Sequence, residues 1–488
     1  MKVRTRFAPS PTGSLHIGGI RSALYPYALA KHFGGEFVLR IEDTDQKRKV
    51  ENGEQYIMDA LKAYGLEWDE FYRQSDRLGI YKEYAQKLVD AGAAYYSFET
   101  KEQLDEARKL AAENKQVFQF RSPDRELSKE DAKARADKGE SYVIRLKTPE
   151  DEELQFEDAV QGKMRFNTRD IDDTVLLKSD GFPTYHLAVV VDDHLMEITH
   201  VLRGFGWIPS IPKHILIHRA FGWEMPVYGH LTDILNPDGK GKLSKRFGAV
   251  AALSFIEKGY LPAAVLNFLM LLGWSSPEAR VHGEKERELF TLKEFVEIFD
   301  LKDLNKSNQR FDQVKLDWFN QKYLQNEDLD KLVEEFTTWL AKYSQDETFN
   351  KEIADKGNDF LKQALELVHE RSKLLSDLPA ALKFFYAKPP KADFAASEKL
   401  KKVNADQVRT VLEKFAAELE KQNGLDTWGH EGWEQSVRGI AGELTIKAGD
   451  AFMVLRLALT GSEFSPPLYE AMVLLGKEEV LARVKDCL

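Results

Sequence analysis

The segment Phe7-Ala8-Pro9-Ser10-Pro11-Thr12-Gly13-Ser14-Leu15-His16-Ile17-Gly18-Gly19 links a β-like stretch, through a loop rich in Pro and Gly, to a helix-like stretch. A loop that leads into a helix N-terminus presents backbone N–H groups and the positive end of the helix dipole, which together favour phosphate. Gly18 and Gly19 carry no Cβ to block a nucleotide, and His16 can donate a hydrogen bond to a phosphate oxygen. The segment therefore predicts a phosphate-binding loop.

The stretches around this loop alternate between strand and helix patterns. Residues 2–8 and 36–42 are β-rich, whereas residues 17–32 and 50–64 have apolar residues at helical spacing. Alternating strands and helices imply a parallel sheet, in which ligands bind at the carboxyl ends of the strands. Ser10 and Glu42 each follow a predicted strand, so we expect both to lie at one crevice.

A second segment suited to phosphate is the cationic loop Lys242-Leu243-Ser244-Lys245-Arg246, which follows an apolar stretch. Lysine side chains there can neutralise the charge that develops on a transferring phosphoryl group. Taken alone, such a loop is also compatible with an ordinary solvated surface, so its meaning depends on the first loop.

The composition sets limits on the class of protein. At 488 residues the chain is long enough for several domains, and its single cysteine, Cys487, excludes an internal disulfide. The N-terminus has no apolar leader, and the apolar run 261–274 is shorter than the roughly 18 to 20 residues that span a bilayer. We therefore expect a cytoplasmic protein without a membrane segment.

The formal net charge of −11 argues, taken alone, against a nucleic-acid partner. Screening over about 8 Å makes local charge more important than the total, however. Lys47-Arg48-Lys49 and the loop 242–246 are candidate basic patches, and each is also compatible with a solvated charge run.

Two groups of residues have the composition of a metal site. Glu42, Asp43 and Asp45 are close in sequence, but along a strand Glu42 would point away from the other two. His214 and His218 have i, i+4 spacing but lack the Glu that follows the first His in a zinc-protease motif. We expect no metal site from either group and place the two histidines on a helix surface.

Beyond residue 75 the sequence changes character twice. Residues 76–184 combine a charged helical stretch, 101–115, with short strands at 142–147 and 163–167, which suggests an insertion. We interpret the apolar run 189–191 as a strand that returns to the sheet, with Tyr185 at the turn before it. From about residue 250 the patterns are mostly helical, including 360–385, 436–459 and 466–484, with Gly461 as a helix stop.

The phosphate loop and the cationic loop, in this order, resemble the paired signatures of class I aminoacyl-tRNA synthetases. The fuller text, Pro9-Ser10-Pro11-Thr12-Gly13 and then Arg40-Ile41-Glu42-Asp43-Thr44-Asp45, is similar to that of bacterial glutamyl-tRNA synthetases, and the similarity covers essentially the whole chain. The resemblance implies an α/β fold: a Rossmann-like class I synthetase catalytic domain with an α+β insertion, followed by an all-α anticodon-binding half.

The resemblance also implies domain boundaries. The Rossmann catalytic domain would comprise residues 1–75 and 185–235, separated by an acceptor-end binding insertion at 76–184. A stem-contact domain with the cationic, KMSKS-like loop would follow at 236–320. Two helical anticodon-binding subdomains would occupy 321–387 and 388–488, with the Pro-containing segment 388–391 at their boundary.

The implied reaction is attack of a glutamate carboxylate on the α-phosphorus of ATP, which needs positioning and cationic stabilisation. An arginine fork suits a carboxylate, and a carboxylate is the natural partner of an ammonium. By resemblance the catalytic residues are His16, Lys242 and Lys245; ATP, with Mg²⁺, is bound by His16, Gly18, Gly19, Ser244, Lys245 and Trp207; and glutamate is bound by Arg6, Ser10, Glu42, Tyr185 and Arg203.

In the helical half the resemblance assigns Arg371, Arg456, Pro466 and Leu468 to the tRNA anticodon, whose unstacked bases are recognised by stacking and hydrogen bonds. Arginine at 371 favours the form that charges only the glutamate tRNA. Some relatives carry a zinc site of cysteines in the insertion. The matching stretch Tyr96-Ser97-Phe98-Glu99 has none, so we expect no structural zinc.

The resemblance implies ATP-dependent attachment of glutamate to tRNA(Glu) through a glutamyl-adenylate, with activation that depends on tRNA. The expected state is a monomer, and the expected partners are tRNA(Glu), L-glutamate and ATP. Two alternatives stay open: a form that also charges tRNA(Gln), and a catalytically impaired tRNA-binding paralogue. Pro26, Val189 and Gly206 depart from the family pattern, and we place Val189 and Gly206 beside the amino-acid pocket.

Overall fold

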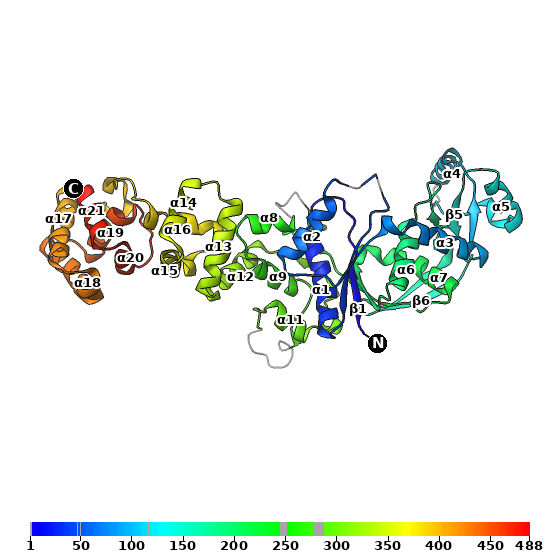
Figure 1. Cartoon of the computed structure of the whole chain (residues 1–488), viewed down its shortest axis with the longest axis horizontal. Coiled ribbons are helices and arrows are strands. Elements are labelled where there is room, and N and C mark those ends of the chain that lie inside the picture. The colour runs from blue at the N-terminus through cyan, green and yellow to red at the C-terminus, as the bar shows by residue number, and fades with distance from the viewer. Residues whose placement is uncertain (1, 46, 49, 115–117, 245–250, 278–286) are drawn as a thin grey trace. The chain divides into compact units, whose positions relative to one another are not determined.

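The computed structural model describes the chain except for residues 1, 46, 49, 115–117, 245–250 and 278–286. The chain divides into two compact units (Figure 1). The first comprises Met1–Phe255 and Val265–Gln313, and the second comprises Ile256–Ala264 and Val314–Leu488. The first unit is built on a parallel sheet, and the second is helical.

A five-stranded parallel sheet lies at the centre of the first unit, in the order β10-β9-β1-β2-β3. Because β1 is the middle strand, Arg6 lies inside the sheet and is only 3% exposed. The strands expected at 2–8 and 36–42 are confirmed. The sheet strands are β1 (Arg4–Phe7), β2 (Glu36–Ile41), β3 (Glu70–Arg73), β9 (His200–Gly204) and β10 (Val227–Leu231).

Helices α1 (Ile17–His32) and α2 (Gly53–Ala63) connect the first three strands, as their apolar spacing predicts. Figure 1 shows α1 alongside β1. Pro26 lies inside α1 without ending it, although it lacks an N–H for the helix. Its carbonyl oxygen accepts a hydrogen bond from Thr5 Oγ1 at 2.7 Å, so this turn of the helix is tied to the sheet.

The expected insertion of mixed structure lies between β3 and the return to the sheet. Strands β4, β5 and β8 form an antiparallel sheet, and β6 with β7 forms a hairpin. Its elements are α3 (Leu78–Asp90), β4 (Ala94–Ser97), α4 (Lys101–Glu113), α5 (Lys129–Asp137), β5 (Val143–Leu146), β6 (Glu153–Asp158), β7 (Gly162–Asn167) and β8 (Val175–Leu177).

The prediction of a strand at 189–191 is wrong, because these residues lie within helix α6 (Tyr185–Leu195). All residues from Leu187 to Asp193 are buried. The run therefore shows no polar face from which a helical period could be recognised, and a short apolar run is compatible with either structure. The strand that returns to the sheet is β9, and Tyr185 is the first residue of α6 rather than part of a turn.

The chain then continues through α7 (Ile211–Phe221), β11 (Ile234–Leu235), α8 (Ala252–Glu257), α9 (Pro262–Leu271), α11 (Leu292–Ile298) and β12 (Gln309–Arg310). Within the described residues, each helix falls short of the length and apolarity that a membrane crossing needs.

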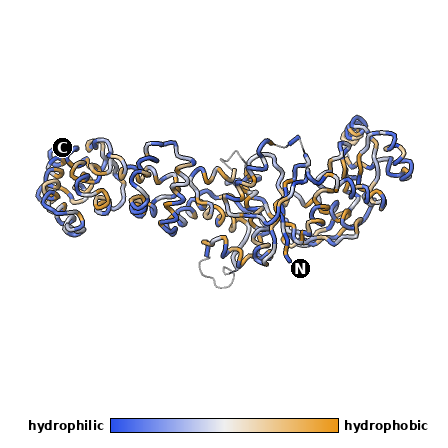
Figure 2. The backbone as a smooth tube through the Cα atoms, viewed as in Figure 1, coloured by the Kyte–Doolittle hydropathy of each residue, from blue (hydrophilic) through white to orange (hydrophobic). Residues whose placement is uncertain are grey.

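The second unit is helical, with two apolar cores. One is centred on Phe336, Leu361 and Leu382, and the other on Leu412, Phe415 and Val454. Figure 2 shows hydrophobic and hydrophilic residues in turn along these helices. The helices are α12 (Gln313–Asn326), α13 (Leu329–Tyr343), α14 (Glu347–Lys356), α15 (Asn358–Val368), α16 (Leu378–Tyr386), α17 (Ala405–Lys421), α18 (Leu425–Glu443), α19 (Ala448–Thr460), α20 (Leu468–Leu475) and α21 (Lys477–Asp486).

The three long helical stretches expected in this half are each divided in two. Residues 360–385 belong to α15 and α16, residues 436–459 to α18 and α19, and residues 466–484 to α20 and α21. Two of the breaks occur at positive φ: 55° at Thr445 and 85° at Gly476. The predicted helix stop is confirmed, since Gly461 ends α19 with a φ of 70°.

Candidate functional site

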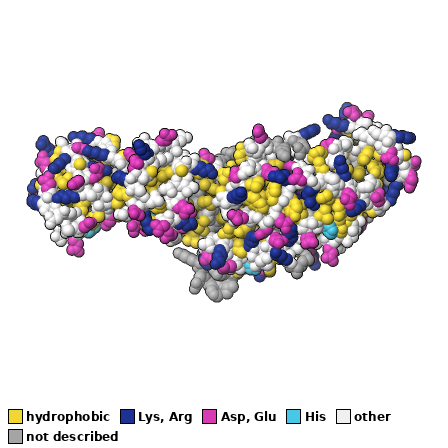
Figure 3. All heavy atoms as spheres, viewed as in Figure 1, with side chains coloured by type: hydrophobic (Ala, Val, Ile, Leu, Met, Phe, Trp, Pro, Cys, Tyr) yellow, Lys and Arg dark blue, Asp and Glu magenta, His cyan; other side chains and the backbone are white. Residues whose placement is uncertain are grey.

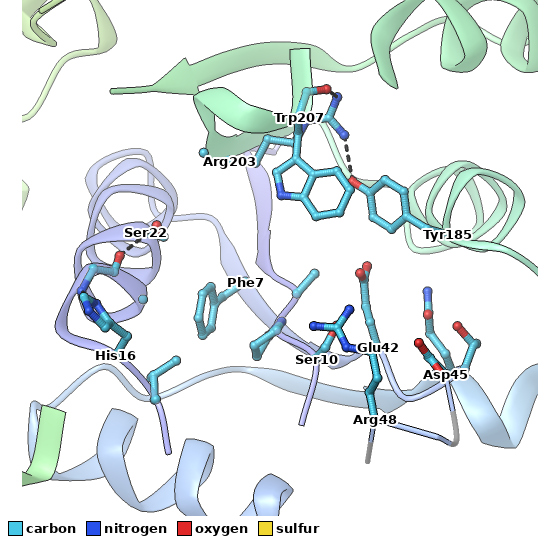
Figure 4. Close-up of a pocket in the computed structure, with 18 of the residues that line it drawn as sticks. Phe7, Ser10, His16, Ser22, Glu42, Asp45, Arg48, Tyr185, Arg203 and Trp207 are labelled. Atoms are coloured by element: carbon cyan, nitrogen blue, oxygen red, sulfur yellow. Dashed lines mark hydrogen bonds between the residues drawn. The ribbon is translucent and has the colours of Figure 1, made fainter. Parts of the chain in front are cut away.

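A cavity of about 1000 Å³ lies at the carboxyl ends of β1, β2 and β9. Ser10 and Glu42 both line it, as the strand order predicts. Figure 4 shows Tyr185, Arg203 and Trp207 on one side of the cavity, and His16 with Ser22 on α1 at another. The same cavity is lined by Arg6, Gly18, Gly19, Lys47, Arg48 and Lys242.

The α1 end of the cavity is built by the N-terminal cap of the helix. His16 is the capping residue, and its Nδ1 accepts a hydrogen bond from the backbone N–H of Gly18 at 3.0 Å. With Nδ1 acting as the acceptor, a neutral His16 ring carries its proton on Nε2. The cap therefore fixes the tautomer of a neutral His16 ring.

Side chains pack closely against the two glycines of this cap. A Cβ on Gly19 would lie 2.5 Å from Cδ1 of Leu15, and a Cβ on Gly18 would lie 3.3 Å from Nδ1 of His16. Since the first distance is closer than real Cβ contacts, the side chain of Leu15 excludes any larger residue at position 19 unless it moves.

Part of the cationic loop is described. Lys242 Nζ pairs with Asp233 Oδ1 at 2.8 Å, and its side chain is 71% exposed at the cavity. The backbone N–H of Ser244 donates to Asn236 Oδ1 at 3.0 Å, so this residue is fixed through its backbone. Lys245, Arg246 and Lys49 lie outside the described residues.

The opposite end of the cavity presents a phenol held by an arginine. Arg203 Nη1 donates to the Tyr185 hydroxyl at 2.9 Å, and the Tyr185 ring stacks on Trp207 with centroids 4.3 Å apart. Burial raises the pKa of Tyr185 to about 12, so the phenol stays protonated at neutral pH. Because its oxygen already accepts from Arg203, its own proton is available for a ligand.

Arg6 and Glu42 bring opposite charges to the same region. Arg6 donates through Nε to Asp193 Oδ1 at 3.2 Å and through Nη1 to the carbonyl oxygen of Leu202 at 3.3 Å. Burial raises the pKa of Glu42, although Arg40 opposes this through a 3.1 Å hydrogen bond to Oε1. A cationic group at Glu42 would offset the cost of burying its charge.

Sequence reasoning missed a buried charge network behind these residues. Arg40 is 0% exposed and donates through Nη1 to Asp193 Oδ1 at 2.7 Å. Asp192 accepts from Arg77 Nε at 2.9 Å and from the Tyr81 hydroxyl at 2.8 Å. The sequence did contain one sign of this network, namely charged residues inside apolar runs. Such residues become buried, and a buried charge needs a partner.

Two of the departures noted in the sequence, Val189 and Gly206, do not line the cavity among the described residues. Val189 is 1% exposed and belongs to an apolar core, and Gly206 is exposed, with no atom within 4 Å of an added Cβ. Because Gly206 precedes Trp207, which does line the cavity, its position beside the pocket stays a prediction.

The placement of His214 and His218 on a helix surface is also wrong. Both lie on α7 as expected, but they are 0% and 2% exposed. The buried face of α7 packs against α6, where His186 Nδ1 lies 3.4 Å from His214 Nε2. Across the described residues, no group of three or more His, Cys, Asp or Glu gathers as a metal site would require.

A second cavity of about 1110 Å³ lies within the helical unit. Arg371 Nη1 and Arg456 Nη1 both donate to the carbonyl oxygen of Ser465, at 2.9 and 3.0 Å, and both line this cavity with Pro466. Leu468 is not among the described lining residues, because it is 5% exposed in the apolar core of α20. Burial and the neighbouring Arg371 lower the pKa of Arg456.

A parallel sheet with a helix N-terminus at its cavity, together with a helical unit, agrees with a class I aminoacyl-tRNA synthetase, and comparison with known families assigns the chain to that class. The model of the family "tRNA synthetases class I (E and Q), catalytic domain" matches residues 2–318, and that of the "Anticodon binding domain" matches residues 331–488. The chain therefore belongs to the class I synthetase family for glutamate and glutamine.

Comparison with individual proteins is more specific than comparison with the family models. The chain is 40% identical to the glutamate–tRNA ligases of Christiangramia forsetii and Clostridioides difficile, covering 99% of this chain and 98% of each relative. Among solved structures, a glutamate tRNA ligase from Elizabethkingia meningosepticum in complex with its amino acid matches with a TM-score of 0.87 and 35% identity, over 100% of this chain and 99% of that one.

Proposed function

We propose that this protein attaches glutamate to tRNA(Glu) at the expense of ATP, through a glutamyl-adenylate and with activation that depends on tRNA. The observation that carries the proposal is the convergence of Arg6, Arg203 and Tyr185 in the cavity that also contains the capped N-terminus of α1. One end of the cavity suits a carboxylate, and the other suits phosphate.

In the first step, an α-carboxylate oxygen of glutamate attacks the α-phosphorus of ATP. A new P–O bond forms, the bond from that phosphorus to the bridging oxygen breaks, and pyrophosphate leaves with the electron pair. ATP enters as its Mg²⁺ complex. His16, Lys242 and Lys245 stabilise the phosphate oxygens together with the helix N-terminus at Gly18 and Gly19.

Glutamate is held at both ends. Arg6 and Arg203 bind the γ-carboxylate as paired donors, and the phenol of Tyr185 adds a third donor. Glu42 and Ser10 bind the ammonium. Trp207, which is 46% exposed and already stacked on Tyr185, offers its other face to the adenine.

In the second step, a ribose hydroxyl at the 3′ end of tRNA attacks the carbonyl carbon of the adenylate. An ester bond forms, the bond between the carbonyl carbon and the phosphate oxygen breaks, and AMP leaves as the hydroxyl releases its proton. Residues 76–184 bind the acceptor end, residues 236–320 contact the stem, and the anticodon is bound by Arg371, Arg456 and Pro466, while the buried Leu468 contributes to the core behind them. Arg371 favours tRNA(Glu) over tRNA(Gln), since its guanidinium offers several fixed donors to a base edge.

The test is exchange of labelled pyrophosphate into ATP with glutamate, with and without each of tRNA(Glu) and tRNA(Gln). Exchange that requires tRNA(Glu) and is not supported by tRNA(Gln) is the expected result. Exchange with both tRNAs would replace the proposal by the form that charges both. Binding of tRNA without any exchange would overturn the catalytic role.

The monomeric state and the cytoplasmic location stay predictions. Gel filtration coupled to light scattering tests the first: a mass near 55.9 kDa is expected, whereas twice that value would contradict it.

A further inference from the structure

A buried chain of hydrogen bonds connects the turn between β6 and β7 with Arg203. His230 Nδ1 lies 2.6 Å from Asp158 Oδ2, and Arg203 Nε lies 3.0 Å from His230 Nε2. Asp158, His230 and Arg203 are 2%, 0% and 6% exposed. The chain ends at the Tyr185 hydroxyl in the cavity.

The direction of each hydrogen bond follows from the chemistry of the groups. Arg203 Nε is always a donor, so His230 Nε2 must be the acceptor. The proton of a neutral ring is then on Nδ1, which donates to Asp158. Burial lowers the pKa of His230, although its bond to Asp158 opposes this, and the ring is accordingly neutral at pH 7.

Asp158 is fixed in one orientation. Its Oδ1 accepts three backbone N–H groups, those of Val160 at 3.0 Å, Gln161 at 2.8 Å and His230 at 3.1 Å. The other oxygen, Oδ2, faces His230. Because Oδ1 is surrounded by donors, the carboxylate cannot rotate to present a different atom without losing these bonds.

The turn that carries Asp158 is attached directly to β10. The Ala159 N–H donates to the carbonyl oxygen of Tyr228 at 2.8 Å, and Gln161 Nε2 donates to the carbonyl oxygen of His230 at 2.8 Å. At Gly229, an added Cβ would lie 2.6 Å from Leu202 Cδ2 and 3.2 Å from Val160 Cγ2. A shift of the hairpin would therefore move the partner of His230.

We propose that Asp158 and His230 are positioning residues, which hold the Arg203 guanidinium in the orientation that binds the glutamate side chain. They thereby connect the β6–β7 hairpin, part of the segment expected to bind the acceptor end, to the amino-acid site. This inference rests on the proposed function. A ligand that shifts the hairpin would change the affinity for glutamate, because it would act on Arg203 through His230.

The variant Asp158→Asn tests the direction of the chain with almost no change in size. Three backbone donors keep the amide oxygen at the Oδ1 position, so the NH₂ group faces His230 Nδ1. The ring must then accept at Nδ1 and carry its proton on Nε2, where it opposes the Arg203 Nε–H. We expect the KM for glutamate to rise about tenfold or more and the KM for ATP to stay within about twofold.

Two variants of His230 separate positioning from packing. His230→Gln keeps an amide oxygen near the Nε2 position and can still accept from Arg203, whereas His230→Asn keeps a polar group only near Nδ1. We expect the KM for glutamate of His230→Gln to stay close to that of the wild type. The KM for glutamate of His230→Asn should rise. Equal KM values for the two variants would overturn the inference.

The matched control is Asp151→Asn, which makes the same chemical change in the same segment. Asp151 is 63% exposed and pairs with Arg169. Both KM values of this variant should match the wild type. Thermal unfolding of all four variants shows whether the fold is retained, since a loss of folded enzyme would lower the apparent kcat and leave both KM values unchanged.

A measurement independent of activity is the ¹⁵N spectrum of the histidine rings, with His230 assigned by its loss in His230→Gln. The expected wild-type signature is Nδ1–H with an unprotonated Nε2, and Asp158→Asn should exchange the two. A wild-type Nε2–H tautomer would contradict the positioning role. An inactive wild type with the expected tautomer would instead count against the proposed function, and pyrophosphate exchange distinguishes these outcomes.

Discussion

Tyr185 contributes two contacts that can be separated, since its ring stacks on Trp207 and its hydroxyl accepts from Arg203. Tyr185→Phe removes only the second. We expect the KM for glutamate to rise about tenfold, the cost of one hydrogen bond to a charged group, with little change in the KM for ATP. Initial rates of aminoacylation at varied glutamate measure this.

Tyr84→Phe is the control for that change, because Tyr84 packs on Phe221 and Trp223 and is not among the described residues that line the cavity. It should leave both KM values unchanged. A Tyr185→Phe enzyme with the wild-type KM for glutamate would show that the phenol hydroxyl does not bind the substrate.

At this scale, the residues that a local motif contains could be predicted, and the residues paired over long sequence distances could not. His16, Gly18 and Ser10 lie in one loop whose pattern indicates phosphate binding. Arg40 meets Asp193, 153 positions later, and no local pattern links the two. The need for a partner could be inferred from the apolar surroundings of each, but the identity of the partner could not.

Among the elements, α6 and α7 carry histidines that predict acid sensitivity. Burial lowers the pKa of His186 to about 4 and that of His214 well below its usual range. In the unfolded chain both titrate near pH 6.5, roughly the value of a free histidine. Between these values the unfolded state binds more protons, so the free energy of unfolding falls as the pH drops below about 6.5.

The expected slope is at most about 1.4 kcal/mol per pH unit for each histidine that titrates. Urea unfolding, followed by circular dichroism at about pH 7, 6 and 5, measures this slope. His186→Asn should reduce the slope, whereas His430→Asn, at an exposed position in α18, should not. A free energy independent of pH across this range would contradict the burial of these rings.

Two features favour glycine at the end of helix α19: the backbone conformation there and a close packing contact. The φ of Gly461 is 70°, and an added Cβ would lie 2.9 Å from Cβ of Pro389. Gly461→Ala should therefore lower the free energy of unfolding by about 2 kcal/mol, of which roughly half is the left-handed backbone. Chemical denaturation of the helical unit measures the change.

Gly222→Ala is the comparison, because Gly222 ends α7 with a φ of 68° and no atom lies within 4 Å of an added Cβ. It should cost about 1 kcal/mol, the backbone term alone. If the free energy of unfolding falls by the same amount in both variants, the contact with Pro389 does not contribute to the effect of Gly461→Ala.

Element types were predictable where polar and apolar residues alternate, and uncertain where they do not. The bounds of α1 agree with the expected range 17–32, because its N-cap and its apolar spacing are both visible in the sequence. The strand expected at 189–191 failed because burial on all sides of α6 removes the period. The breaks at Thr445 and Gly476 depend on single backbone angles, which a composition average does not reveal.

At the scale of the whole molecule, the net charge of −11 does not describe how charge is distributed locally. On the face drawn in Figure 3, Lys and Arg side chains are interspersed with Asp and Glu. Most of the charged residues that line the cavity of the helical unit are nevertheless cationic, namely Arg371, Lys373, Lys383, Lys388, Lys399 and Arg456. Because screening limits each charge to its surroundings, an acidic chain can still present a surface for tRNA.

Each unit has its own cavity, which predicts that substrate effects can be separated by unit. Arg371→Gln should raise the KM for tRNA(Glu) about tenfold, through loss of a charged donor, and leave the KM for glutamate unchanged at saturating tRNA. Arg409→Gln is the control, since Arg409 is 69% exposed on α17 and pairs with Glu413.

Combining Arg371→Gln with Tyr185→Phe tests this separation. The two residues lie in different compact units and bind different substrates in the proposed function, so their effects on the transition-state free energy should add within about 0.5 kcal/mol. Aminoacylation rates of the wild type, both single variants and the double variant provide the cycle. A coupling above about 1 kcal/mol would mean that anticodon contacts alter the glutamate site itself. The effect of tRNA on activation would then include a contribution from the helical unit in addition to that of the β6–β7 hairpin.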